Sequence, residues 1–328
     1  MLTDDELDAL LGPGSPTRVM LADASTVYAA FPAFIYPVLS PKGGKGVDDH
    51  DRIGKVSVRD EVRLEDVIGR ARDTIDLVLG VVFADEERRE VAAAIEELHR
   101  FIHGELADGS KYHAWENDLW NWTWAAIMIP LMDAHEKLRG WPSDQFREDA
   151  YAGLRAVGAL FGAASLPDTY DGFIEYRDSS WLESVDPSAA AATSYLLGQR
   201  ADPSRLRSPS KFPHTFTRIV SGPARHIARV GLLLVNTDTV GAAMGMSPTR
   251  ADEVTLAAHR HIWRLIPRRA SSGWVECYMR IRLRFGSPEP VWRTHYSPAA
   301  LAQYRQRMRA ARAADTSEPP RPSTKTRT

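Results

Sequence analysis

Cysteine is almost absent from this chain, which has one, Cys277, among 328 residues. A single thiol excludes an internal disulfide, a four-cysteine zinc site and the paired cysteines that attach a c-type haem covalently. No neighbouring residues form a nucleophile signature around Cys277, so a structural role is its simpler interpretation. Any chemistry that the chain performs must therefore depend on other side chains.

Long hydrophobic runs and an excess of one charge are also missing. Apolar runs such as residues 230–235 are far shorter than the roughly 20 residues of a membrane span. The N-terminus is acidic where a signal peptide would be basic. With 41 Lys and Arg against 43 Asp and Glu, the net charge of -2 gives no electrostatic case for nucleic acid. These features predict a cytoplasmic protein with no transmembrane segment and no nucleic-acid partner.

Several common catalytic motifs are absent as well. The sequence has no HExxH, no GxSxG and no GxxxxGK followed by Ser or Thr, which argues against a zinc protease, a serine hydrolase and a P-loop nucleotide site. A di-iron bundle needs Glu-x-x-His twice, and Glu96 with His99 supplies one copy. A histidine among apolar residues of a helical chain then leaves haem ligation or plain core packing.

The stretch 90–104 contains that histidine. Its apolar residues recur at helical spacing and form one stripe, with Gly104 as the expected helix stop; they are Val91, Ile95, Leu98 and Ile102. His99 falls at the edge of this stripe. From the residues alone, His99 is a packing residue, a general base or an axial metal ligand, and packing is the commonest of the three.

Similar periodicity over most of the chain predicts an all-α fold, a single large helical domain with a globin-like core. The expected helices cover residues 64–83, 116–139, 143–161, 189–197, 216–235, 249–265 and 298–314, and residues 40–54 read as a glycine-rich, charged loop. Strand-like alternation over 274–285 predicts a short β ribbon near the C-terminus, with a helix as the alternative.

The ends of the chain differ in composition from the rest. Residues 1–18 are polar with Gly and Pro, which predicts a flexible lead-in, and residues 19–314 form the helical domain. Residues 315–328 are rich in Pro, Ser, Thr, Arg and Lys without an apolar anchor, so a disordered basic tail is expected. The oligomeric state has no sequence signal.

A series of short motifs follows in a fixed order after residue 69. It begins with Arg-x-x-x-Thr at Arg70 and Thr74 and continues with VVFAD and Leu-His-x-x-Ile-x-Gly around His99. The element Asp-Gly-x-x-Tyr-x-Ala at 108–114 and the aromatic helix beginning at Leu119 complete the series. In order and spacing these motifs resemble the family of latex clearing protein and the MpaB oxygenases, helical b-type haem proteins that cleave isoprenoid double bonds with dioxygen.

The resemblance implies a cofactor and roles for three residues. It implies non-covalent haem b, with His99 as the proximal axial ligand of the iron and Arg70 and Thr74 as cofactor-binding and catalytic residues on the distal side. The implied function is a haem-dependent oxygenase that acts with dioxygen or peroxide on a small apolar intracellular substrate, isoprenoid or lipid.

One departure concerns Asp73, which stands where latex clearing proteins have a lysine. A buried carboxylate is costly unless it is paired, so Asp73 is expected to pair with Arg70 or turn toward solvent. The competing hypothesis is a haem-free helical binding or scaffold protein, in which His99 only packs and the site has lapsed.

Overall fold

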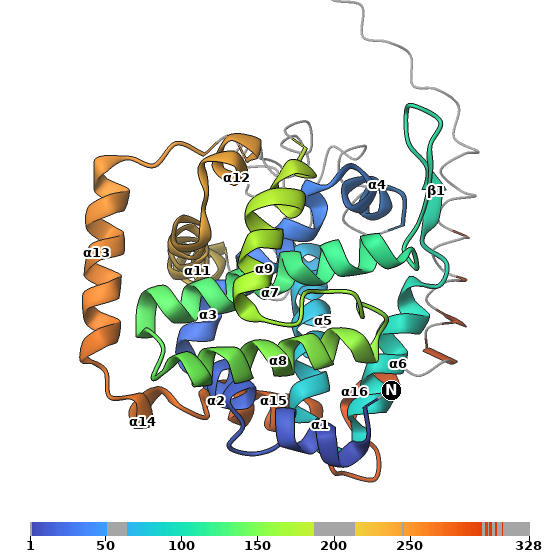
Figure 1. Cartoon of the computed structure of the whole chain (residues 1–328), viewed down its shortest axis with the longest axis horizontal. Coiled ribbons are helices and arrows are strands. Elements are labelled where there is room, and N and C mark those ends of the chain that lie inside the picture. The colour runs from blue at the N-terminus through green and yellow to red at the C-terminus, as the bar shows by residue number, and fades with distance from the viewer. Residues whose placement is uncertain are drawn as a thin grey trace, which may run out of the picture.

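The computed structural model describes residues 2–50, 64–186 and 214–296, apart from Gly245, and scattered positions between 299 and 310. Across these ranges the chain is almost entirely helical (Figure 1), so the all-α prediction is confirmed. The helices are α1 Asp4–Leu11, α2 Pro16–Ala22, α3 Val27–Ile35, α4 Pro41–His50, α5 Leu64–Phe83, α6 Arg88–His99, α7 Asn117–Arg139, α8 Asp144–Leu160, α9 Tyr170–Tyr176, α11 His214–Val235, α12 Asp238–Ala243, α13 Arg250–Leu265, α14 Arg268–Ser271, α15 Trp274–Leu283 and α16 Val291–Tyr296.

Short turns and one small hairpin join these helices. The turns are η1 Ala24–Thr26, η2 Tyr36–Leu39, η4 Asp85–Glu87 and the π turn η5 Arg177–Trp181. The two strands found in the described residues are β1 His103–Glu105 and β2 Lys111–His113, which pair antiparallel.

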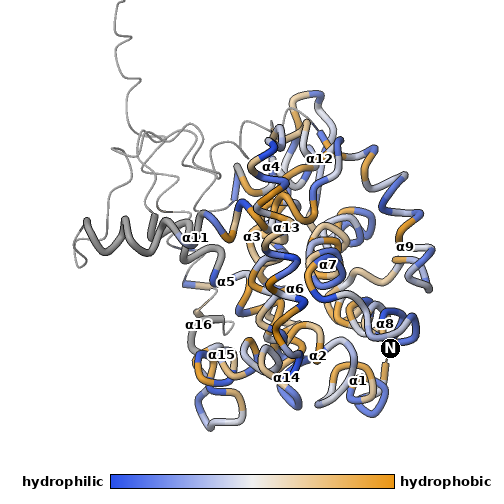
Figure 2. The backbone as a smooth tube through the Cα atoms, turned by 90° about the vertical axis from the view of Figure 1, so that its left-hand side faces the viewer, coloured by the Kyte–Doolittle hydropathy of each residue, from blue (hydrophilic) through white to orange (hydrophobic). Residues whose placement is uncertain are grey.

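Helix α7 is the centre of the core. It packs against α3, α8, α11 and α13, and it is buried on most of its circumference, as expected for a helix that is apolar nearly all round. Trp124 is 1% exposed, and its Nε1 donates a hydrogen bond to the carbonyl of Leu154 in α8 at 2.9 Å. Figure 2 shows hydrophobic segments gathered toward the middle of the molecule, with mixed polarity along outer helices such as α8.

Helices α3 and α11 approach each other at a glycine. A Cβ atom added to Gly231 would lie 2.0 Å from the carbonyl oxygen of Tyr28, so no larger residue fits without moving a backbone. The side chain of Tyr36, which is fully buried, donates a hydrogen bond to the carbonyl of Val235 at 3.1 Å and fixes the end of the same contact.

The prediction of a flexible lead-in over residues 1–18 is wrong. Thr3 and Glu6 form a capping box at the start of α1. Leu7 and Leu11, four residues apart, are 1% and 0% exposed, and α1 packs against α8. Two leucines on one face are enough to dock a short helix when a partner surface exists, although they give little periodicity in the sequence.

Two further predictions need correction. Residues 274–283 form α15 rather than part of a β ribbon, because Met279 and Leu283 are the buried positions and lie four apart on one helix face. The expected loop at 40–54 contains a helix, α4, up to His50, and residues 51–54 lie outside the described part, as do the expected helix 189–197 and the tail 315–328. The lone thiol, Cys277, is exposed on α15.

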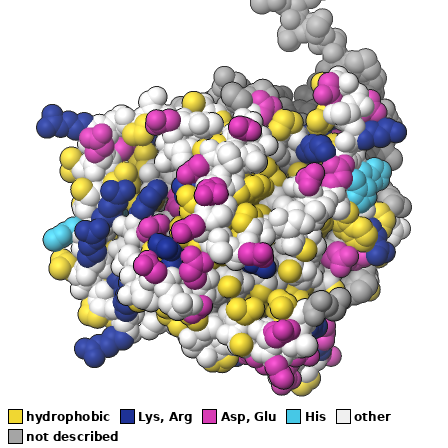
Figure 3. Space-filling model, viewed as in Figure 1, with side chains coloured by type: hydrophobic (Ala, Val, Ile, Leu, Met, Phe, Trp, Pro, Cys, Tyr) yellow, Lys and Arg dark blue, Asp and Glu magenta, His cyan; other side chains and the backbone are white. Residues whose placement is uncertain are grey.

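The surface combines both charges. On the face drawn in Figure 3, acidic and basic side chains are interspersed, and basic ones are frequent at the left-hand edge, where α13 lies. Within the residues described, no single helix has the length and apolar character to cross a membrane; one pair, α2 with Ala24–Leu39, passes that test together but is bent by 67°.

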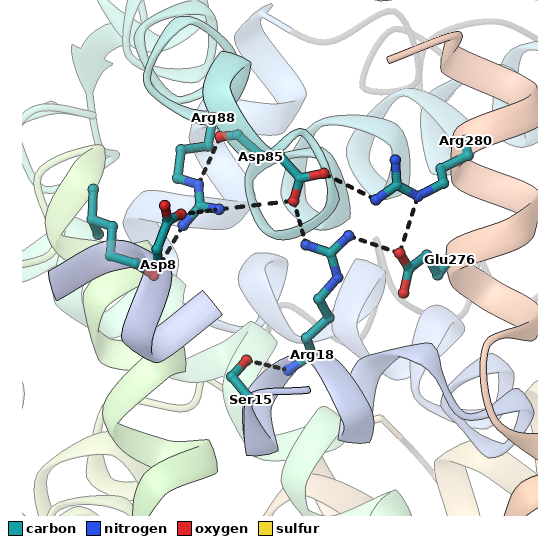
Figure 4. Close-up of polar contacts among 8 residues, drawn as sticks. Asp8, Ser15, Arg18, Asp85, Arg88, Glu276 and Arg280 are labelled. Atoms are coloured by element: carbon teal, nitrogen blue, oxygen red, sulfur yellow. Dashed lines mark hydrogen bonds and ion pairs between the residues drawn. The ribbon is translucent and has the colours of Figure 1, made fainter. Parts of the chain in front are cut away.

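A buried arginine connects three distant parts of the chain (Figure 4). Arg18 is 1% exposed and donates to Asp85 at 2.5 Å and to Glu276 at 2.7 Å, joining α2 to η4 and to α15. Arg280 donates to the same two carboxylates at 2.9 and 3.0 Å. Burial alone would raise the pKa of Asp85, but the hydrogen bonds and charges of Arg18 and Arg280 outweigh it and hold that pKa below its ordinary value.

Removing the charge of Arg18 should therefore destabilise the protein. Arg18→Met leaves Asp85 and Glu276 in a partly dehydrated position with one partner fewer, and we expect a loss of about 3 kcal/mol in the free energy of unfolding. The matched control is Arg89→Met, because Arg89 pairs with Asp4, which is 83% exposed. That variant should lose less than about 1 kcal/mol. Urea unfolding measures both, and equal losses would contradict the structural role given to Arg18.

Candidate functional site

Helix α6 ends earlier than the sequence predicts. Its last residue is His99, and the chain then turns into the hairpin of β1 and β2, in which His103 pairs with His113. Gly104 is therefore a strand residue and not a helix stop. A Cβ atom on Gly104 would lie 2.7 to 2.9 Å from the Tyr112 side chain, so a glycine is needed there for the strands to close.

The ring of His99 is held by its own helix. Its Nδ1 lies 2.7 Å from the carbonyl oxygen of Ile95, one turn earlier. A carbonyl only accepts hydrogen bonds, so Nδ1 carries the hydrogen and the lone pair of the neutral ring is on Nε2. Metal-binding histidines are commonly fixed in this way, with one nitrogen donating to a carbonyl and the other directed to the metal.

An aromatic side chain of α7 packs against the ring of His99. The ring centroids of His99 and Trp120 are 4.8 Å apart, and Trp120, which is 6% exposed, contacts Phe161 at 5.6 Å. Ile95 is buried while His99 is partly exposed. His99 therefore lies at the border between core and solvent, which agrees with its position at the edge of the apolar stripe.

Helices α5 and α6 form a hairpin that brings the predicted site residues to one end. The two helices pack against each other and are joined by the short turn η4, so they run antiparallel. At about 1.5 Å per residue, His99 lies about 17 Å from the turn. On the same scale Thr74 lies about 14 Å and Arg70 about 20 Å from the turn along α5. All three positions thus belong to the same end of the hairpin.

The side chains of the three α5 positions are described to different extents. Thr74 and Asp73 are partly exposed, whereas the side chain of Arg70 lies outside the described part of the structure. The Asp73 carboxylate, 22% exposed, accepts hydrogen bonds from Arg72 Nη2 at 3.0 Å and Nε at 3.3 Å. The pairing expected between Asp73 and Arg70 stays a prediction, as do the catalytic roles of Arg70 and Thr74.

A buried acid on α5 was missed in the sequence. Asp76, two residues after Thr74, is 2% exposed, and its Oδ2 lies 3.4 Å from Arg282 Nη2 on α15. A carboxylate within the otherwise apolar run that ends at Phe83 was the available signal, since such a residue is buried only with a partner. The pair links α5, the helix of the predicted distal residues, to α15.

The histidines in and beside the β1–β2 hairpin have structural partners. His50 Nε2 donates to the carbonyl of His103 at 2.8 Å, so α4 is joined to β1. The rings of His103 and His113 stack with centroids 5.8 Å apart, and the backbone N–H of Trp115 donates to His113 Nδ1 at 3.0 Å. Tyr112 adds a hydrogen bond to Asp49 at 2.9 Å. None of these contacts could be read from sequence spacing.

A buried imidazole, that of His135, lies on α7. It is 3% exposed, and among the described residues neither ring nitrogen has a hydrogen-bond partner. Its ring centroid lies 4.9 Å from that of Trp141. Burial lowers the pKa of His135 to about 4. A neutral imidazole in an apolar setting also suits an axial metal ligand, so His135 is the alternative to His99 that experiments must separate.

The ligand set restricts the kind of metal centre. In the part of the chain that the structure describes, no group of three or more His, Cys, Asp or Glu side chains is placed to hold a metal ion. A haem iron needs only one axial ligand from the protein, since the porphyrin supplies four nitrogens. The donors present around His99 therefore fit a haem better than a mononuclear zinc or di-iron site.

Comparison with known proteins gives one match. Residues 17–268 match the family described as ER-bound oxygenase mpaB/B'/Rubber oxygenase, catalytic domain. No curated protein and no solved structure matches the chain. The matched range covers more than half of the sequence and contains α5, α6 and α7.

The buried imidazole should make stability depend on pH. The pKa of His135 is about 4 in the folded chain and about 6.5 when unfolded, so the unfolded state binds more protons between these values. The contribution of His135 to the free energy of unfolding is therefore complete above pH 6.5 and is lost as the pH falls toward 4. The loss is roughly 2 kcal/mol between pH 7 and pH 5. His135→Leu should remove this part of the slope.

Urea unfolding of both proteins at pH 7 and pH 5 measures the difference. Asp23, Arg139 and Arg268 are the charged groups that act on His135, and they are kept in the variant. His261→Leu, at an exposed position, is the control and should leave the slope unchanged. An unaltered slope in His135→Leu would show that this ring does not titrate as described.

Proposed function

The chain belongs to the mpaB and rubber oxygenase family, and on that premise we propose that it is a haem-dependent oxygenase. Its substrate is a small apolar molecule of the isoprenoid or lipid class, and its oxidant is dioxygen or peroxide. One observation carries the proposal: Nδ1 of His99 donates to the carbonyl of Ile95, so the lone pair of the neutral ring is on Nε2, the nitrogen that would bind a metal. The family supports the oxygenase class, and the orientation of His99 supports the haem.

The residues around His99 suit a non-covalent haem b. Cys277 is alone, so no pair of thiols is available for covalent attachment. Trp120 provides aromatic surface beside His99, Phe161 packs on Trp120, and a porphyrin ring is stabilised by apolar and aromatic contacts. When bound, haem supplies the redox chemistry that activates the oxidant.

The protein's own part is to hold, orient and exclude water. His99 would hold the haem iron through its imidazole, and its hydrogen bond to the carbonyl of Ile95 fixes the ring plane and raises the basicity of Nε2. The Thr74 hydroxyl can donate one hydrogen bond and accept two, and Arg70 is a permanent cation with five N–H donors. These two residues orient a polar oxidant, while the aromatic side chains keep the apolar substrate away from water.

Asp73 remains a departure from the lysine of latex clearing proteins. Its carboxylate accepts hydrogen bonds from Arg72, so the local charge is balanced without a ligand role. We infer that Asp73 does not bind the iron and that the distal polar groups are Arg70 and Thr74.

The first test is haem uptake. Purified protein mixed with haemin should develop a Soret band and hold one haem per chain after gel filtration. His99→Ala should lose the band or shift it strongly, because the axial ligand is removed. His135→Leu is the matched control and should keep the wild-type spectrum.

The outcomes separate the alternatives. Loss of the band in His135→Leu but not in His99→Ala would transfer the ligand role to His135. A wild-type protein that takes up no haem would overturn the proposal and favour a haem-free binding protein. Circular dichroism of each variant shows that the helices are intact, so a lost band is not a folding effect.

The second test concerns the distal residues. Thr74→Val keeps the shape of the side chain but removes its hydroxyl. We expect haem content to be unchanged and the rate of oxidant consumption with an isoprenoid substrate to fall about 100-fold, the usual order for one positioned donor. Thr74→Ser restores the hydroxyl and should recover most of the rate. A Val variant as fast as the wild type would remove Thr74 from the site.

A further inference from the structure

Two histidines from different helices meet at a position far along the chain from His99. Nε2 of His226 in α11 and Nε2 of His259 in α13 are 3.0 Å apart, and the ring centroids are separated by 5.1 Å. The helices α11 and α13 pack against each other. His226 is exposed and His259 is partly buried, so the space beside the two nitrogens is open to solvent on one side.

A buried phenol fixes the inner ring of the pair. The hydroxyl of Tyr28, a residue 7% exposed, lies 2.9 Å from Nδ1 of His259. The Tyr28 ring is itself held edge-on to Trp263 at 6.0 Å. When Nδ1 donates to the phenol oxygen, the lone pair of His259 is on Nε2 and points at His226. A polar group on the remote nitrogen is the usual support for a metal-binding imidazole.

We propose that His226 and His259 form a binding site for a divalent transition-metal ion, with Cu²⁺ the best suited. Imidazole nitrogens lie about 2.0 Å from such ions, so two neighbouring ligands are about 2.8 Å apart at a right angle and about 3.3 Å apart in a tetrahedron. The observed separation of 3.0 Å falls between these values. Rotation of both rings would let their lone pairs converge on one ion, and the general affinity order favours Cu²⁺.

The contact seen between the rings is the metal-free state of this site. With the lone pair of His259 on Nε2, the hydrogen between the rings belongs to Nε2 of His226. Metal binding moves that hydrogen to Nδ1 of His226, on the exposed ring, and no net proton is released. Because no group of three or more ligand residues lies together among the described residues, water completes the coordination.

A bound ion would join α11 to α13 near the surface. Figure 1 shows α13 at the edge of the molecule opposite to α6, with α11 next to it on the inner side, so the site is separate from the α5–α6 hairpin that carries His99. The inference therefore does not depend on haem binding. Ligands that bind only the folded state stabilise it, so the ion should raise the unfolding temperature.

The experiment uses the full chain with any purification tag removed. Cu²⁺ is titrated while electron paramagnetic resonance is recorded, and the expected spectrum shows two coordinated nitrogens. His226→Ala and His259→Ala should each weaken binding at least tenfold and abolish the rise in unfolding temperature. His113→Ala is the matched control, because it breaks the other close pair, His103 with His113, and should leave both readouts unchanged.

The unfolding temperature and the Cu²⁺ affinity of His226→Ala test the proposal. His226 is exposed, so its alanine variant should fold normally, and its unfolding temperature without metal should match the wild type. Equal Cu²⁺ affinity in His226→Ala and wild type would overturn the proposal. A two-nitrogen signal that disappears in His113→Ala and persists in His226→Ala would also overturn the proposal, because it would place the ion on the β1–β2 hairpin.

Discussion

The closure of the α5–α6 hairpin at Asp85 is the constraint on which the candidate site depends. Asp85 has a φ of +50°, a left-handed backbone conformation that residues other than glycine adopt at a cost. Its carboxylate is held by Arg18 and Arg280, and its carbonyl accepts a hydrogen bond from Arg88 at 2.8 Å. These contacts offset the conformational cost of the positive φ at Asp85 and fix the turn. The fixed turn determines which residues of α5 lie beside which residues of α6.

The candidate site lies at the end of the α5–α6 hairpin, at the border between solvent-exposed polar side chains and the hydrophobic core. His99 is positioned by a bond within its own helix and by a ring contact to Trp120 in α7. Because α7 is buried on most sides, that ring contact connects His99 to the most constrained element of the fold. Asp76 and Arg282 hold the facing helix α5 against α15. Each helix of the hairpin is thus tied to a different part of the core.

Much of this arrangement could be predicted from sequence, because helix periodicity is a local property. The spacing of Val91 and Ile95 placed His99 correctly at the edge of an apolar stripe, and the motif order indicated the family that the match over residues 17–268 confirms. The features that the sequence did not predict depend on contacts between residues from different elements. Leu7 and Leu11 become core residues because α1 packs against α8, and Gly104 is a strand residue that lies opposite Tyr112 in the β1–β2 pair.

The same reason explains which site residues sequence reasoning missed. Trp141 and Phe146 follow His135 only after α7 has ended at Arg139, so residue spacing does not show that their rings pack against its imidazole. Nothing near His259 in the sequence shows that His226 lies opposite. Asp76 was detectable because a charge in an apolar run is a local signal. Histidines are harder, since the sequence around a packed imidazole and around a metal ligand is alike.

The exposure of Cys277 has a consequence for handling the protein in air. With no second cysteine in the chain, its thiol can form a disulfide only with another molecule. Two copies joined in this way would meet at α15, one residue from the Glu276 carboxylate that Arg18 holds. A covalent dimer formed on storage would therefore be joined beside the arginine network, and a reducing agent prevents it.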